Sequence, residues 1–251
     1  MRILITGLNG TVAPGVAKVL ESFDHIIIPY DREFVSTESF EEIYTFIENT
    51  QPDVLLHFAT GSIEWSLLLA KAAHELLVKF IYISSVSVFS AKTTPGPFTP
   101  DKKPNATDDY GQYKANTEKA LLSEYPLTTI IRLGWQIDHV TSTNNMLNHL
   151  KTMMDKHGII KASKKWYPSC SFIADTGKAI LDIIHKEPDI YHVDSNDGYS
   201  FYELVSFLKS IHTWIKVSDE SNFVMNNQLV DERVNIRKLS QIIKDIGEYS
   251  V

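Results

Sequence analysis

Tyr110 and Lys114 stand four residues apart in a segment that reads Tyr-Gly-Gln-Tyr-Lys. That spacing places both side chains on one face of a helix, one turn from each other. An ammonium group near a phenol favours the phenolate, so the tyrosine could exchange a proton near neutral pH. Ordinary amphipathic helices show the same spacing, and the pair therefore indicates chemistry only beside a cofactor or substrate site.

A glycine-rich turn near the amino terminus predicts such a site. Residues 3–6 form a short apolar run, typical of a buried parallel strand, and a helical pattern starts just after the turn. A strand, a glycine turn and a helix N-terminus together present free amide groups to a phosphate. We therefore expect a bound dinucleotide at Gly7, Asn9, Gly10, Thr11 and Val12.

The next predicted strand, residues 25–30, leads into Asp31, which lies 24 positions after Gly7. A dinucleotide site places at about this distance the acid that bonds the adenosine ribose. Arg32 follows directly and could instead meet the 2′-phosphate of NADP. Both residues are candidate cofactor ligands, and the sequence leaves NAD(H) and NADP(H) open.

Apolar strands and helical patterns alternate along the first half of the chain. We predict helices at residues 41–48, 64–77 and 109–124, and strands at residues 53–59, 79–85 and 128–134. This alternation is typical of an α/β protein with a Rossmann-type doubly wound parallel sheet. We expect an NAD(P)-binding Rossmann domain at residues 1–135 and a small C-terminal α/β substrate lobe at residues 136–251. Within that lobe, residues from about 172 to 195 should return to the sheet.

Composition and charge narrow the class of protein. Hydrophobic residues at 43% and charged residues at 22% are ordinary for a globular protein, and a net charge of −7 disfavours a nucleic-acid partner. The single cysteine, Cys170, fits a reducing compartment. There is no signal-peptide pattern and no apolar run of the ~18 residues that a membrane helix needs. We expect a cytoplasmic protein with no membrane partner, and the scattered histidines predict no metal site.

Several motifs together resemble one enzyme family. The glycine turn matches a TGxxGxxA pattern at Thr6, Gly7, Gly10 and Ala13, and Ser84-Ser85 ends the fourth predicted strand. Ser85 precedes the YxxxK tyrosine by 25 positions. In these features the chain resembles the extended (atypical) short-chain dehydrogenases/reductases of the NAD-dependent epimerase/dehydratase superfamily. Among them it is most similar to the dTDP-4-dehydrorhamnose reductases.

The resemblance implies an oxidoreductase that reduces a nucleotide-activated 4-keto sugar with NAD(P)H. Tyr110 would donate a proton to the carbonyl oxygen, Lys114 would lower the pKa of Tyr110 and hold the nicotinamide ribose, and Ser85 would bond the same oxygen. The segment Phe58-Ala59-Thr60 would lie against the cofactor. Ser85, Ser87 and Trp135 would contact the nucleotide-sugar substrate. A homodimer through the helices at residues 64–77 and 109–124 is a further expectation.

The chain departs from the family at several positions, and two other functions stay open. The loop after Ala59 is short, Phe58 replaces an alanine, and Val86-Ser87 replaces an Asp-Tyr pair. An epimerase of the same superfamily would share the three catalytic residues. A non-catalytic NAD(P)-binding regulatory subunit would keep the fold and the cofactor without turnover.

Overall fold

A computed structural model describes residues 1–138 and 145–248. Its centre is a six-stranded sheet in the order β10–β5–β4–β3–β1–β2, in which every neighbouring pair is parallel. The strands are β1 (Arg2–Thr6), β2 (Ile26–Tyr30), β3 (Val54–His57), β4 (Lys79–Ser85), β5 (Thr129–Leu133) and β10 (Ile190–Val193). The predicted α/β class with a doubly wound parallel sheet is confirmed.

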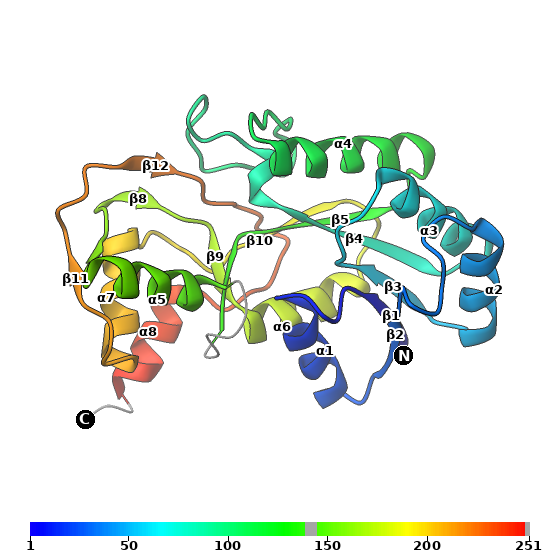
Figure 1. The fold of residues 1–251 in the computed structure, drawn as a ribbon, viewed down its shortest axis with the longest axis horizontal. Helices are drawn as coiled ribbons and strands as arrows, with labels where there is room; N and C mark the ends of the chain where they lie inside the picture. The colour runs from blue at the N-terminus through cyan, green and yellow to red at the C-terminus, as the bar shows by residue number, and fades with distance from the viewer. Residues whose placement is uncertain (139–144, 249–251) are drawn as a thin grey trace.

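Helices cover both faces of this sheet (Figure 1). One face carries α1 (Ala13–Ser22) and α6 (Ile173–Ile184), and the other carries α2 (Phe40–Thr50), α3 (Ile63–Glu75) and α4 (Asp109–Glu124). Because successive strand residues point to opposite faces, Ile3 and Ile5 join the core under α1 and α6, whereas Leu4 joins the core under the other helices.

A second group of elements lies beside the sheet at the left of Figure 1. It contains the helices α5 (Met146–His157), α7 (Phe201–Ile211) and α8 (Leu239–Glu248), which share a third apolar core. Short parallel strand pairs complete it: β6 (Trp135–Ile137) with β9 (Cys170–Phe172), β7 (Ile160–Lys161) with β11 (Val217–Ser218), and β8 (Lys165–Tyr167) with β12 (Val224–Asn226). Strand β10 adds to the main sheet and α6 packs against α1; the division into two domains at residue 135 stays a prediction. In the described part of the chain, no helix is long and apolar enough to cross a bilayer.

A buried ion pair fixes α4 to the sheet. The guanidinium of Arg132 on β5 lies 2.7 Å from the carboxylate of Glu118 on α4, and the two side chains are 1% and 3% exposed. Arg132 Nη1 also donates to His192 Nε2 on β10 at 3.2 Å. The guanidinium lies 4.9 Å from the ring centroid of Phe89, in the loop after β4. One arginine therefore connects α4, β5, β10 and that loop.

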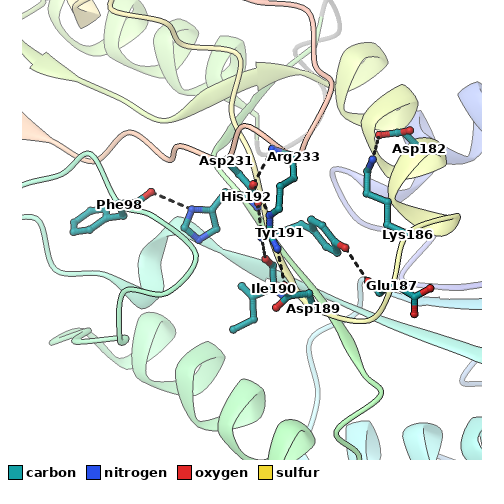
Figure 2. A network of polar contacts seen from close by, with 10 residues as sticks. All are labelled: Phe98, Asp182, Lys186, Glu187, Asp189, Ile190, Tyr191, His192, Asp231 and Arg233. Atoms are coloured by element: carbon teal, nitrogen blue, oxygen red, sulfur yellow. Dashed lines mark hydrogen bonds and ion pairs between the residues drawn. The ribbon is translucent and has the colours of Figure 1, made fainter.

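His192 is held in one tautomer by its two partners, and Figure 2 shows its contact with Phe98. Its Nδ1 donates to the Phe98 carbonyl at 3.1 Å, which leaves Nε2 to accept from Arg132. Burial and the neighbouring Arg132 lower the pKa of His192 to about 4. In the same network Asp231 accepts from the His192 backbone amide, and Arg233 pairs with Asp231 and Asp189. The side chains of Asp231 and Arg233 thus bind the backbone of β10 along its exposed edge.

Acidification should destabilise the protein through His192. In the unfolded state the imidazole of His192 binds a proton near pH 6.5, whereas in the folded state it stays neutral down to about pH 4. The imidazole therefore costs no stability above about pH 6.5, and stability falls as the pH drops through that value. Between about pH 6.5 and pH 5 the loss should reach roughly 2 kcal/mol.

Urea unfolding of the wild type and of His192→Asn at several pH values measures this effect. The variant lacks the titrating ring, so the difference in unfolding free energy between the two proteins should shift by that amount in favour of the variant on acidification. A difference that stays constant with pH would show that His192 does not titrate as its burial requires.

Candidate active site

A cavity of about 530 Å³ lies at the carboxyl ends of the central strands. Its walls come from the residues that follow β1 and β3, from the ends of β4 and β5, and from the starts of α1 and α4. The chain runs from β1 to β2 on one side and returns to β3 on the other, so the strand order switches direction at β1. Ligands of open α/β sheets bind at such a point.

The glycine turn forms the floor of one end of this cavity. Gly7 has a φ of +81°, which only glycine adopts readily, and a β-carbon there would lie 2.9 Å from the Ala59 amide nitrogen. The Gly10 amide donates to the Gly7 carbonyl at 2.8 Å and closes the turn before α1. The turn thus packs too closely against the backbone after β3 to carry a side chain at Gly7, and its backbone forms a cradle in the wall of the cavity. This cradle, followed directly by a helix N-terminus, fits a diphosphate.

The structure brings together most of the residues predicted for the cofactor, but not all. Gly7, Asn9, Gly10, Thr11, Val12, Arg32, Phe58, Ala59, Thr60, Tyr110 and Lys114 line the cavity. Asp31 does not line it, because its side chain closes a local turn: Asp31 Oδ1 accepts from the Glu33 amide at 2.9 Å.

Tyr110 and Ser85 meet at the other end of the cavity. Tyr110 lies in the first turn of α4 and is 49% exposed, and its hydroxyl is hydrogen-bonded to the Ser85 side chain at the end of β4. Ser85 Oγ also accepts from the Ser87 amide at 3.1 Å. Partial burial raises the pKa of Tyr110, and the hydrogen bond with Ser85 opposes that rise. The phenol is therefore protonated at neutral pH.

Lys114 is almost completely buried beside them, with 2% of its surface exposed. Its Nζ donates to the Ile83 carbonyl at 2.8 Å and lies 4.6 Å from the ring centroid of Tyr82. Burial lowers the pKa of Lys114 to about 8, and Glu118 one turn further along α4 opposes that shift. In this arrangement the ammonium of Lys114 is bound by the Ile83 carbonyl and lies over the Tyr82 ring, and the pKa of Tyr110 is raised by burial. That Lys114 lowers the pKa of Tyr110 stays a prediction.

Two residues predicted to contact substrate lie outside the cavity lining. Ser87 is in a short 3₁₀ turn, residues Val86–Val88. Trp135 stacks on Trp166 and Phe201, with ring centroids 6.2 Å away in both cases, so it belongs to the aromatic core beside the sheet. Six further residues line the cavity, namely Ala13, Ile83, Ser84, Leu133, Gly134 and Gln136. Ala13 and Ser84 belong to the sequence motifs, but none of the six was predicted as a site residue. Most of them lie at the ends of β4 and β5. Their position at the carboxyl end of a predicted strand is the sequence feature that could have identified them as site residues.

Gly111 sets the position of Tyr110, and substituting it should damage the site. A β-carbon at Gly111 would lie 2.1 Å from the Ser87 carbonyl oxygen and 2.7 Å from the Ala106 β-carbon. Since that carbonyl belongs to the backbone after Ser85, Gly111→Ala should push the start of α4 away from β4, at a cost of about 1–3 kcal/mol.

Thermal unfolding and dinucleotide titration of Gly111→Ala check this expectation. Gln112→Ala, at the exposed next position, is the matched control and should behave like the wild type. A Gly111→Ala protein with wild-type stability would contradict the close approach of α4 to the Ser87 backbone.

The sheet order and the position of the cavity define the chain as a Rossmann-type α/β protein. The RmlD substrate binding domain family matches residues 63–214, more than half of the sequence, and the chain belongs to that family. The resemblance inferred from the glycine turn and the Ser–Tyr–Lys spacing is confirmed at this level.

Individual relatives are distant in sequence. The chain is 20% identical over 221 residues to the spore coat polysaccharide biosynthesis protein SpsK of Bacillus subtilis, covering 82% of this chain and 77% of SpsK. It is similar to a dTDP-4-dehydrorhamnose reductase structure from Clostridium acetobutylicum, with a TM-score of 0.79, 18% identity and full coverage of both chains. The Bacillus anthracis dTDP-4-dehydrorhamnose reductase, solved with NADP, gives a TM-score of 0.78 at 18% identity over 100% of this chain and 99% of that one. At these identities the structures show the shared fold.

Proposed function

We propose that the protein is an NAD(P)H-dependent reductase of a nucleotide-activated 4-keto sugar. One observation carries the proposal: Ser85, Tyr110 and Lys114 line the same cavity as the glycine cradle. A cofactor whose diphosphate lies on the cradle would extend along the carboxyl ends of β1, β3 and β4 toward the hydroxyl pair. The names of the reductases that share the fold, one of them solved with NADP, support the same reading.

The chain's own residues fit this cofactor. The glycine turn before the N-terminus of α1 lines the cavity, as a diphosphate site requires, and Phe58, Ala59 and Thr60 form a wall beside it. Lys114 keeps its charge at neutral pH, since its pKa of about 8 lies above that range. When bound, the reduced dinucleotide supplies a hydride. Lys114 would hold the nicotinamide ribose through the donors that Ile83 does not use.

Tyr110 and Ser85 provide the groups that a carbonyl reduction needs. The raised pKa of Tyr110 keeps its phenol protonated, so it can donate a proton to a carbonyl oxygen as negative charge develops there. The Ser85 hydroxyl, already hydrogen-bonded to Tyr110, can donate to the same oxygen and stabilise that charge. The half-exposed position of Tyr110 leaves its phenol open to substrate from the cavity.

The nucleotide-sugar substrate rests on the family and on the relatives. SpsK is named for polysaccharide biosynthesis and the two solved relatives for reduction of dTDP-4-dehydrorhamnose. Ser87 and Trp135 stay proposed substrate contacts, and both lie outside the lining of the cavity.

A binding titration followed by a turnover assay tests the proposal. Purified protein is titrated with NADH and NADPH, and cofactor oxidation is then followed with a panel of 4-keto nucleotide sugars. The reductase is supported by binding and by turnover on at least one sugar. Tight cofactor binding without turnover on any sugar would favour a regulatory subunit, and absence of binding would overturn both readings.

A further inference from the structure

A second cavity, of about 470 Å³, lies at the amino ends of β4 and β5, at the opposite edge of the sheet from the candidate active site. Its walls come from the end of α3, from the turn between α4 and β5, and from the turn between α6 and β10. The volume is in the range of small-molecule sites. Among the described residues, none lines both cavities, so the two are separate.

Two unusually exposed leucines line the open side of this cavity. Leu77 is 93% exposed and Leu127 is 64% exposed. Leu77 follows α3 with a φ of +56°, a backbone region in which glycine or asparagine is usual after a helix. Leucine in this position strains the backbone and presents an apolar side chain to solvent. Val78, Phe80 and Pro188 add further apolar surface to the lining. An apolar ligand body would cover this surface.

Lys79 brings a positive charge to the same cavity. Its Nζ donates to the backbone carbonyls of Ile184 and Lys186, which leaves one of its three protons free. Among the described residues it has no ion-pair partner, whereas the Lys186 side chain is paired with Asp182 at 2.9 Å (Figure 2). Burial lowers the pKa of Lys79, and Glu187 opposes that shift from further away. An anionic group of a ligand would supply the missing counter-charge.

Thr128 adds a hydroxyl group that no protein group binds. Thr128 lines the cavity and is 2% exposed, and among the described residues its Oγ1 has no hydrogen-bond partner. A buried hydroxyl without a partner costs stability, so a ligand atom that accepts from it would relieve that cost. The imidazoles of His74 and His185 are further polar groups of the lining. An apolar wall with a few convergent polar groups is the usual composition of a small-molecule site.

We propose that this cavity is a second ligand site, which takes a small amphipathic anion: an apolar or aromatic body that carries one carboxylate. The body would cover Leu77 and Leu127, and the carboxylate would accept from Lys79 and Thr128. The site does not depend on the proposed reductase function, because it shares no lining residue with the candidate active site in the described part of the chain.

Calorimetric titration of the full chain with 4-phenylbutyrate tests the site. The alcohol 4-phenylbutan-1-ol and the amine 4-phenylbutylamine are the neutral and cationic probes with the same apolar body. The wild type should bind the carboxylate about tenfold or more tightly than either of them, as a charge-assisted hydrogen bond provides. Saturating NADPH should leave this binding unchanged.

Two threonine variants separate ligand binding from stability. Thr129, the next residue, is also buried and its hydroxyl is also without a partner among the described residues, but it does not line the cavity. Thr128→Val and Thr129→Val should both raise the thermal unfolding midpoint of the ligand-free protein, because each removes an unpaired buried hydroxyl. Only Thr128→Val should weaken binding of 4-phenylbutyrate, by about tenfold.

A second pair of variants tests the charge of the ligand. Leu127 is exposed, so its replacement should leave the fold intact. Leu127→Asp should weaken binding of 4-phenylbutyrate more than Leu127→Asn does, because the added carboxylate repels the anion.

The other results would overturn the proposal in distinct ways. Absence of 4-phenylbutyrate binding to the wild type would overturn the site. Binding of the alcohol or the amine as tightly as the carboxylate would overturn the anionic class of the ligand. Equal affinity of the wild type and Thr128→Val, or displacement of 4-phenylbutyrate by NADPH, would show that the probe binds elsewhere.

Discussion

Tyr110→Phe should lower the turnover number by about 10²–10⁴-fold while cofactor affinity stays close to that of the wild type. The substitution removes only the hydroxyl, which is the proton donor in the proposed reaction and the partner of Ser85. The aromatic ring at the start of α4 remains, so the walls of the cavity keep their shape. Steady-state kinetics with a 4-keto nucleotide sugar, together with dinucleotide titration, measures the two effects separately.

Tyr113 provides the matched control on the same helix. Its hydroxyl accepts a hydrogen bond from the Gly61 amide at 3.2 Å and does not line the cavity. Tyr113→Phe should therefore cost about 1 kcal/mol of stability and leave turnover nearly unchanged. Equal activity of Tyr110→Phe and Tyr113→Phe would show that Tyr110 is not the proton donor.

Glu118→Gln should destabilise the protein by about 3–5 kcal/mol, because it leaves the Arg132 guanidinium buried without a counter-charge. Arg132 and Glu118 are almost fully excluded from solvent, and the neighbouring His192 is neutral at pH 7, with its pKa lowered to about 4. Within residues 1–138 and 145–248, Glu118 is the one carboxylate that pairs with Arg132. Urea unfolding at neutral pH measures the loss.

An exposed pair of equal length serves as the control. Lys151 and Asp155 on α5 are also 2.7 Å apart, but their side chains are 47% and 63% exposed. Asp155→Asn should cost less than about 1 kcal/mol, since water screens the charges. The double variant Glu118→Leu with Arg132→Met should recover part of the loss by removing both charges. A Glu118→Gln protein no less stable than Asp155→Asn would refute the buried pair as a structural anchor of α4.

Local sequence patterns predicted the parts of the fold that local physics decides. The strand at residues 79–85 and the helix at residues 109–124 begin and end as predicted. The apolar runs and the Asp108 cap, which accepts from the Gly111 amide at 2.9 Å, are encoded within a few residues. The meeting of the glycine turn with Ser85 follows from parallel strands, whose carboxyl ends share one edge of the sheet.

Side-chain directions at the site could not be predicted in the same way. Spacing alone places Lys114 one turn from Tyr110, yet the ammonium binds the Ile83 carbonyl, a partner on another element. The sequence offers both Asp31 and Arg32 as cofactor ligands. In the structure Asp31 accepts from the Glu33 amide in a local turn, and only Arg32 lines the cavity. Trp135 stacks on Trp166 and Phe201, which come from distant segments. These outcomes depend on long-range contacts that no short window contains.

Transfer of labelled hydride tests net reduction of a 4-keto nucleotide sugar most directly. The protein is mixed with NADPH deuterated at the transferred position and with dTDP-4-dehydrorhamnose or a related 4-keto sugar, and the product is analysed by mass spectrometry. Deuterium should appear in the sugar as NADPH is consumed in equal amount, and Tyr110→Phe should slow this transfer. A sugar product that forms without deuterium and without loss of NADPH would show an epimerase, and no product with bound cofactor would show a regulatory subunit.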